Sequence, residues 1–319
     1  MFLSILVPNY GFSELTVRCF QSLKSQVKNN DIEIIVCDQS DDLSKKKLLE
    51  LTKVIPNVKV ITLNKPDVLL ARKTLLQEAS SDYIFFVDSD DYVDEGFVDQ
   101  LLSKIIENDY PDLIVTSYYL ESSKSITKND DLSFINDSNF GKYFYCSDLV
   151  NTLWRKIFKR LLFNPDDISN LESTNGDDWI ISLPVVKNAK SRCFEPTLCG
   201  YHYCMNDSSL THTMTLERFK KSFALKDVFL ESYENVDYEL LFKSKMSKFS
   251  SFCVLSYRQN KDKNIIKSSF VFVRNNIFNV LKIPRNAACG FKQKTLYFLI
   301  KYNLFSLFFI AIKRAAKKL

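Results

Sequence analysis

The 319-residue sequence is poor in glycine, proline and histidine, with 6, 8 and 2 residues respectively. So few glycines and prolines exclude a collagen-like or low-complexity chain, and 46% hydrophobic residues exclude a disordered one. A chain of this length and composition should form a globular protein of one large domain or two modest ones.

Cysteine pairs at a metal-binding spacing are also absent. The eight cysteines include no CxxC pair and lie in apolar or mixed segments, so buried, reduced thiols are expected instead of a disulfide or zinc framework. Cys199, His202 and Cys204 are close in sequence, but no fourth ligand follows at a familiar zinc spacing. We expect this group to be structural. His202 could reach a metal, but a partly buried histidine is the preferred interpretation.

The first seven residues lack the basic residues of a secretory signal and run directly into Pro8. We expect them to form a first strand, and the body of the protein to be cytoplasmic.

Acidic residues are missing from the C-terminal part. From Lys263 onward there are 12 Lys or Arg and no Asp or Glu, whereas the first 262 residues carry 31 basic and 38 acidic residues. This asymmetry between an acidic body and a basic tail indicates an anionic surface as a partner.

Residues 296–312 of this tail are almost entirely apolar. As one helix they would reach about 26 Å, short of the roughly 30 Å hydrocarbon core of a bilayer. We therefore expect a helix that lies in an anionic leaflet. The alternative is a core helix packed on the preceding helices. Nucleic-acid binding is disfavoured by the long aromatic and aliphatic run.

Short apolar runs alternate with helical patterns in the first 120 residues. The expected strands are 3–7, 32–37, 58–63, 83–87 and 113–119, and helical patterns follow Ser13 and cover 69–79 and 97–106. Such alternation predicts an α/β fold with crossover units on an open, mostly parallel sheet, which binds ligands beyond the carboxyl ends of its strands.

The rest of the chain is less regular at first. Residues 121–140 are polar and should form a connection or lid, 148–158 should form a helix and then a strand, and 178–186 a helix. From 216 to 319 the pattern is helical, with Pro284 and Gly290 as expected breaks.

Acidic residues follow two of the expected strands. Asp38 ends the second, and Asp88-Ser89-Asp90-Asp91 follows the fourth. Three carboxylates in four residues repel one another and are not expected to serve stability, whereas Mg²⁺ or Mn²⁺ shared with a diphosphate would offset the repulsion. The alternative is a solvated turn that caps the next helix. Tyr92 and Val93 exclude a calcium-binding EF-hand loop.

In these stretches the sequence resembles the inverting, GT-A-fold nucleotide-sugar glycosyltransferases of the family-2 type, common in bacterial polysaccharide synthesis. The matching segments span about residues 3–210 in the order that the family shows; they are 4–10, 33–42, 71–73, 83–91, 154–158 and 176–179. The resemblance implies a GT-A domain at 1–215, with a nucleotide-sugar-binding half at 1–120 and an acceptor half at 121–215. A helical region at 216–319 would follow, with a basic, membrane-associating tail.

For the donor, the resemblance implies that Pro8, Tyr10 and Asp38 hold the nucleotide base. The Asp38 carboxylate would accept the imide N–H of uracil, which favours UDP-sugars. Arg72 would lie against the base or the phosphates.

For the reaction, the resemblance places Asp88 near the ribose, with Ser89 also among the donor-binding residues, and Asp90 on a Mg²⁺ or Mn²⁺ that bridges the diphosphate. Asp178 would be the general base that deprotonates the acceptor hydroxyl, and a single displacement with one base inverts the anomeric carbon. The alternative role for Asp177-Asp178 is to cap the N-terminus of a helix, and this role could coexist with catalysis.

The chain departs from the family at several positions. Lys73 replaces the usual Asn, Asp177 the usual Glu, and Cys204 a common Arg, while the usual glycine is missing after Asp38.

We expect an inverting glycosyltransferase, peripheral on the cytoplasmic face of the inner membrane, that moves a sugar from a UDP-sugar donor to a glycan or lipid-linked glycan acceptor. No nucleic acid is expected as a partner. A catalytically inactive scaffold of the same fold is the alternative. A phosphatase that uses Asp88 and Asp90 would be expected to have Thr or Val at position 92, so Tyr92 argues against this class of enzyme.

Overall fold

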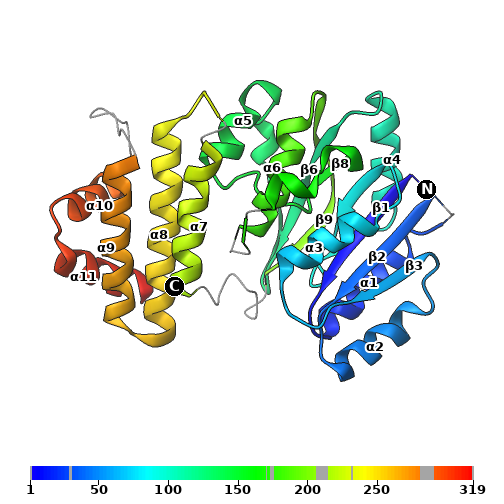
Figure 1. Ribbon diagram of the computed structural model, residues 1–319, viewed down its shortest axis with the longest axis horizontal. Helices are drawn as coiled ribbons and strands as arrows, with labels where there is room; N and C mark the ends of the chain where they lie inside the picture. The colour runs from blue at the N-terminus through cyan, green and yellow to red at the C-terminus, as the bar shows by residue number, and fades with distance from the viewer. Residues whose placement is uncertain are drawn as a thin grey trace. The chain divides into compact units, whose positions relative to one another are not determined.

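The computed structural model describes residues 2–28, 31–169, 171–172, 176–205, 215–230, 233–280 and 291–317 (Figure 1). The chain divides into two compact units. The first comprises Met1–Ser138, Asn151–Ser173 and Asp177–Asn206; the second comprises Asn139–Val150, Thr174–Gly176 and Asp207–Leu319. The second unit thus includes residues 139–150, well before the expected domain boundary.

The first unit is an α/β structure built on a sheet that has nine strands in the described part of the chain. The strands are β1 (Leu3–Asn9), β2 (Ile32–Asp38), β3 (Val58–Thr62), β4 (Tyr83–Phe86), β5 (Tyr92–Val93), β6 (Leu113–Glu121), β7 (Ile126–Lys128), β8 (Lys156–Lys159) and β9 (Arg192–Cys204). They lie in the order β3-β2-β1-β4-β8-β6-β9-β5, and β7 pairs with β6. The expected α/β fold class is confirmed.

The first four strands pair in parallel, as their alternation with helices predicts. The fifth apolar run, β6, does not pair with β4, because β8 lies between these two strands and is antiparallel to both. Beyond it, β6 is parallel to β9. The expectation of a sheet built from consecutive crossovers is therefore wrong after β4.

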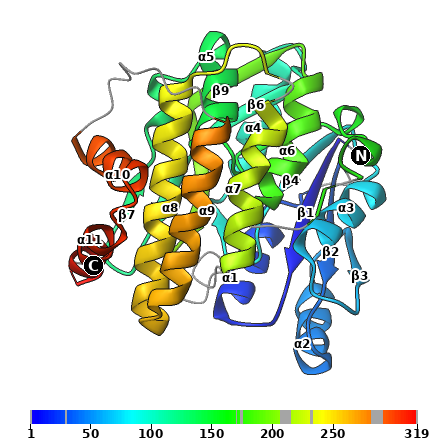
Figure 2. The same ribbon diagram turned by 60° about the vertical axis from the view of Figure 1, so that its left-hand side comes forward.

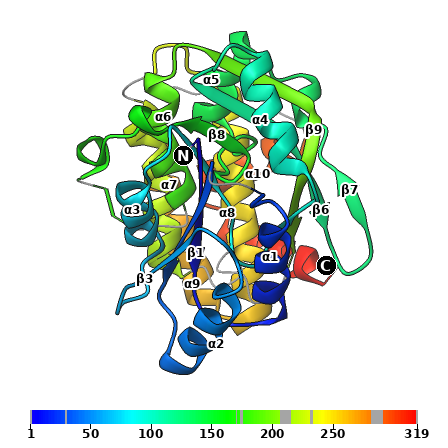
Figure 3. The same ribbon diagram turned by 90° about the vertical axis from the view of Figure 1, so that its right-hand side faces the viewer.

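In the described part of this unit the α-helices are α1 (Glu14–Lys24), α2 (Asp42–Thr52), α3 (Val68–Glu78), α4 (Phe97–Glu107) and α6 (Asp177–Asn188). Figure 3 shows α1 and α3 on opposite sides of β1. Ser13 caps α1 as predicted, with its hydroxyl accepting from the Thr16 N–H. Asp41 caps α2 in the same way, which starts that helix within a few residues of the end of β2.

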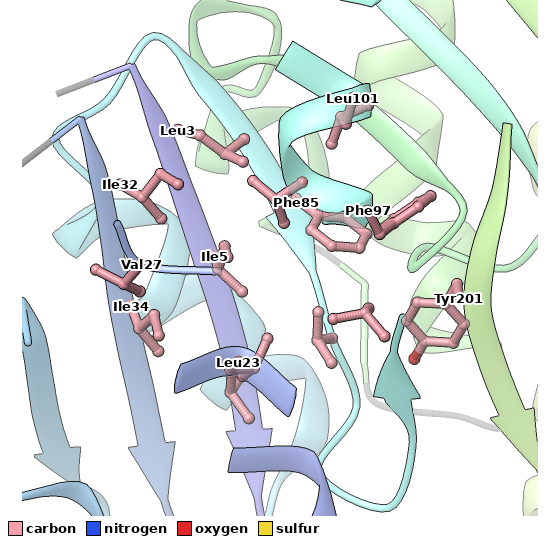
Figure 4. Close-up of a cluster of buried hydrophobic side chains, with 14 of the residues drawn as sticks. Leu3, Ile5, Leu23, Val27, Ile32, Ile34, Phe85, Phe97, Leu101 and Tyr201 are labelled. Atoms are coloured by element: carbon pink, nitrogen blue, oxygen red, sulfur yellow. The ribbon is translucent and has the colours of Figure 1, made fainter. Parts of the chain in front are cut away.

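Alternate residues of the strands face two different layers. The side chains of Leu3 and Ile5 in β1 lie in one buried cluster with Phe97 of α4 and Tyr201 of β9 (Figure 4). Phe20 of α1 belongs to the same cluster. The intervening residues face α3, which packs on β1 and β2. Burial on both faces explains why these strands read as continuous apolar runs.

The second unit is helical. It holds most of α5 (Asp137–Cys146), with α7 (Leu216–Leu230), α8 (Tyr238–Asn260), α9 (Lys263–Val280), α10 (Phe291–Lys301) and α11 (Phe305–Ala316). Helices α7, α8 and α9 lie side by side (Figure 2). Phe219 stacks on Phe252 with ring centroids 4.4 Å apart. Helical structure after residue 216 is as expected; the expected breaks at Pro284 and Gly290 lie outside the described residues.

The apolar tail is two helices and not the single helix expected over 296–312. The chain turns between α10 and α11 at Asn303, whose φ of 55° lies in the left-handed region that asparagine tolerates. Phe308 and Ile312 of α11 are buried, and α11 packs against α8. Among the helices of the described residues, none is both long enough and apolar enough to span a membrane.

Two irregular stretches differ from expectation. Residues 148–155 form turns and not a helix, although the strand that follows is present as β8. Residues 121–140, expected as a connection or lid, include β7, a short 3₁₀ helix at Asp131–Ser133 and the start of α5.

Candidate functional site

The polar residues singled out in the sequence gather where β1, β2 and β4 end. Asn9 and Asp38 are register partners at the ends of β1 and β2, and Asp88 follows β4 directly. Because parallel strands end at the same edge of a sheet, three distant segments meet there.

Asp38 presents an unused acceptor at this edge. Its side chain is buried, and Oδ1 accepts hydrogen bonds from Asn9 Nδ2 at 2.9 Å and from the Ser40 hydroxyl at 2.5 Å. Among the described residues, no group donates to its Oδ2, which is also buried. A buried carboxylate oxygen without a partner is costly, so this atom is suited to accept from a ligand.

The turn after β1 places Tyr10 beside this position. Tyr10 is 69% exposed, and the next residue, Gly11, has a φ of 82° that disfavours other residues. The Gly11 N–H donates to the Ser40 hydroxyl at 2.7 Å. This bond ties the turn to the end of β2, and it leaves the ring of Tyr10 open to solvent. Pro8 lies in β1 next to this turn.

Gln39 stands where the family usually has glycine, and the structure gives it a role that the sequence did not reveal. Its Nε2 donates to the carbonyls of Lys65 and Asp67 at 2.7 and 3.1 Å. Its Oε1 accepts from the Asp67 N–H at 3.2 Å. Gln39 therefore fixes the loop that leads into α3.

Arg72 of α3 lies between two acids. Its Nη2 contacts Asp88 Oδ1 at 3.3 Å, and its Nη1 forms an ion pair with Asp178. The side chain is buried, and no described group hydrogen-bonds to its Nε. Burial disfavours the charged guanidinium, but the carboxylates of Asp178 and Asp88 outweigh this and raise the pKa of Arg72. The contact of Arg72 with base or phosphates stays a prediction.

Asp88 is held in a form of high electrostatic cost when it is ionised. Burial, together with the neighbouring charges of Asp178 and Asp90, raises the pKa of Asp88 to about 7, although Arg72 acts in the opposite direction. Its backbone N–H donates to the Tyr201 hydroxyl at 3.2 Å. The following residues, Ser89 and Asp90, are half-buried in the turn.

Asp91 corrects the interpretation of the acidic run. Its carboxylate points into the protein, where it accepts from the Tyr201 hydroxyl at 2.6 Å and from the Cys204 N–H at 2.8 Å. Burial and the charges of Asp88 and Asp90 raise its pKa well above the ordinary value. One of the three clustered acids therefore serves the fold by binding β9, contrary to the expectation that none would.

Asp178 lies in the first turn of α6. Its Oδ2 accepts from the Leu153 N–H at 3.1 Å while its Oδ1 pairs with Arg72. The side chain is 26% exposed, so it is held on both oxygens and still reaches solvent. Residue 178 thus lies in the same cluster as Asp88, more than 80 residues away in sequence.

The segment before β8 supports this cluster. Arg155 is fully buried and forms a two-pronged ion pair with Asp131, with Nη–Oδ distances of 2.6 and 2.8 Å. Trp154 stacks on Tyr201 with centroids 4.5 Å apart. Asp131 could not be singled out from the sequence, because it lies in a polar stretch without periodicity.

His202 is a buried structural histidine, as expected. Its ring lies between those of Tyr92 and Tyr119, with centroids 4.2 and 4.8 Å away, and its Nε2 is 2.9 Å from Asp94 Oδ1. Cys204 Sγ lies 2.8 Å from Arg18 Nη2. The cysteines of the described residues are free thiols, and five of these seven are buried.

Within the described residues there is no group of three or more His, Cys, Asp or Glu side chains that could hold a metal by itself. A Mg²⁺ ion commonly uses one or two carboxylates together with substrate phosphates and water. The oxygen donors of Asp88 and Asp90 fit that chemistry when a diphosphate completes the shell.

A family model described as glycosyl transferase family 2 matches residues 4–164, half of the sequence, so the chain belongs to this family. Glycosyltransferase GlyA of Streptococcus pneumoniae is 30% identical over 117 residues, 37% of this chain and 17% of GlyA. Poly(ribitol-phosphate) beta-N-acetylglucosaminyltransferase TarP of Staphylococcus aureus is 23% identical over 227 residues, 67% of this chain and 66% of TarP. The chain spans less than two thirds of either relative.

The crystal structure of S. aureus TarS residues 1–349 in complex with UDP-GlcNAc is similar to this chain, with a TM-score of 0.65 at 18% identity. The match covers 88% of this chain and 82% of that chain. It confirms the expected GT-A fold with a C-terminal helical extension, and the family match confirms the resemblance seen in the sequence.

Proposed function

We propose that this glycosyltransferase moves a sugar from a UDP-sugar to a hydroxyl of a glycan, with inversion, in cell-surface polysaccharide biosynthesis. The observation that carries the proposal is the buried Asp38 Oδ2, which accepts no hydrogen bond from any residue that the structure describes, beside the exposed ring of Tyr10. An imide N–H of uracil would satisfy this oxygen, and the ring can stack on the base. The solved complex of TarS with UDP-GlcNAc supports a UDP-sugar donor.

The diphosphate would lie near Asp90, with Asp88 and Ser89 closer to the ribose. Bound Mg²⁺ or Mn²⁺ would supply a Lewis acid for the departing UDP. Asp90 offers carboxylate oxygens there. Burial and the neighbouring charges of Asp178 and Asp90 raise the pKa of Asp88, and a cation beside Asp90 would offset part of that repulsion.

Asp178 would accept the proton of the acceptor hydroxyl. The Leu153 N–H and Arg72 orient its carboxylate, and each oxygen keeps lone-pair capacity for a further hydrogen bond. Arg72 joins this base to Asp88 on the donor side, so Arg72 positions both groups at once.

The acceptor class rests on the relatives. TarP is a poly(ribitol-phosphate) beta-N-acetylglucosaminyltransferase. For this chain we propose a glycan or lipid-linked glycan of the cell surface as the acceptor, and a peripheral location on the cytoplasmic face of the membrane.

Titration calorimetry with UDP tests the donor site. We expect binding with Mn²⁺, loss of most binding with EDTA, and weakening of about tenfold or more in Asp38→Asn, whose amide places a second donor group near the imide N–H. Asp41→Asn, which alters an exposed helix cap in the same segment, is the matched control and should bind as the wild type. Equal UDP affinity in the presence of Mn²⁺ and of EDTA would refute the proposed role of the metal.

A screen for UDP release across the common UDP-sugars then identifies the donor.

A further inference from the structure

The hairpin of α10 and α11 has an apolar surface that the second unit leaves uncovered. Phe298, Tyr302, Leu307 and Ile310 are between 46% and 56% exposed. We call these four residues the outer face. Leu307 and Ile310 lie one turn apart on α11, so they project from the same side of that helix.

The opposite side of the hairpin is a packed core. Phe308 stacks on Phe249 of α8 with centroids 5.2 Å apart and lies 5.1 Å from Phe270 of α9. Ile300 of α10 is also buried, with 1% of its surface exposed. The hairpin therefore belongs to the helical unit, and its outer face is a fixed surface.

Basic residues border the outer face. Lys301 lies 5.6 Å from the ring of Tyr302, and Lys313 lies 5.7 Å from that of Phe309. Lys313 and Arg314 are both exposed in the last turns of α11. The sequence has no Asp or Glu from Lys263 to its end, so no carboxylate of α9, α10 or α11 offsets these charges.

We propose that the outer face docks on an anionic lipid surface, with Leu307, Ile310, Phe298 and Tyr302 entering the interface and Lys301, Lys313 and Arg314 contacting lipid phosphates. The inference deepens the proposed function by naming the surface that brings the enzyme to its membrane. Exposed apolar side chains ringed by cations match an interface where hydrocarbon and negative headgroups meet. A core-packed hairpin and a lipid-binding one are thus compatible, because they use opposite sides of α10 and α11.

Sedimentation of the full-length protein with vesicles tests this proposal. We expect binding to phosphatidylcholine vesicles that contain phosphatidylglycerol, little binding to phosphatidylcholine alone, and weaker binding in high salt. Leu307→Ser/Ile310→Ser and Lys313→Glu/Arg314→Glu should each lower the partition coefficient by about tenfold or more.

Matched controls are available on and beside α2. Leu43→Ser/Val54→Ser replaces residues of similar exposure, and Lys46→Glu/Lys47→Glu reverses two exposed charges; both should bind vesicles as the wild type does. All four variants should keep the circular dichroism spectrum and the UDP affinity of the wild type. A loss of vesicle binding can therefore be told apart from a loss of folding or of UDP binding. Wild-type-like vesicle binding by both α11 variants would overturn the inference. Concentration-dependent dimers that these variants abolish, without vesicle binding, would also overturn it, since they would assign the face to a second copy.

Discussion

Single residues in this site do more than one task. Arg72 holds Asp88 and Asp178, two acids that the family resemblance assigns to opposite substrates. A guanidinium can serve two carboxylates at once because its donors are arranged in a planar fork, which the single ammonium of lysine lacks. The geometry of the proposed base therefore depends on a residue that the sequence comparison assigned to the nucleotide.

Asp178→Asn should keep UDP affinity and lose transfer by about 10² to 10⁴, because an amide cannot take the acceptor proton. Calorimetry and single-turnover transfer assays measure the two effects. Asp177→Asn, the adjacent acid in the same helical turn, is the control and should transfer sugar far better than Asp178→Asn. Turnover near the wild-type rate in Asp178→Asn would remove this residue from the mechanism.

At the level of elements, the first four strands and their helices could be predicted from sequence, because each is specified by its own residues. The run at 32–37 is β2, and the helical pattern at 97–106 is α4. The position of β8 between β4 and β6 could not be predicted, because it depends on which distant strand has a free edge.

The candidate site divides in the same way. Asp38 and Asp88 could be placed from the rule that parallel strands end together. The partners of Arg72 and the inward direction of Asp91 could not, because they depend on α6 and β9 being packed nearby. The turn at Asn303 was also missed, since the apolar pattern continues through it.

Helix α8 contains a lysine, Lys248, whose charged form is disfavoured in the folded protein. Burial lowers the pKa of Lys248 to about 8 from 10.5; Asp148 opposes this shift, and Lys226 and Lys245 add to it. Between pH 8 and pH 10.5 Lys248 binds more protons in the unfolded chain than in the folded one. The contribution of Lys248 to the free energy of unfolding therefore rises with pH across this range.

Lys248→Met should therefore raise the free energy of unfolding below pH 8 and flatten its rise toward pH 10. Asp148 keeps Lys226, at 2.9 Å, as its partner. Urea titrations across this range measure the effect. Lys243→Met, at a more exposed position on the same helix, is the control. A lower unfolding free energy for Lys248→Met at neutral pH would contradict the expectation.

For the molecule as a whole, the proposed chemistry predicts the stereochemistry of the product. Asp38 and Asp90 are assigned to the donor, and Asp178 is the acid assigned to the acceptor, which leaves one base for one direct attack. Retention by double displacement would require a carboxylate nucleophile at the anomeric carbon.

We therefore expect a β-linked product from an α-linked UDP-hexose. The anomeric proton coupling in the NMR spectrum of the purified product measures this directly. An α-linked product would refute the single displacement and, with it, the role proposed for Asp178.

The inward orientation of Asp91 changes how a mutational scan of residues 88–91 should be interpreted. Its carboxylate accepts hydrogen bonds from Tyr201 and Cys204 at the end of β9, so its replacement would loosen the packing of this strand whether or not a cation binds nearby. An inactive Asp91 variant would therefore be a folding defect that imitates a catalytic one. The acidic run therefore has two separate roles: Asp91 stabilises the fold, and Asp88 and Asp90 are the acids proposed to act on the substrate.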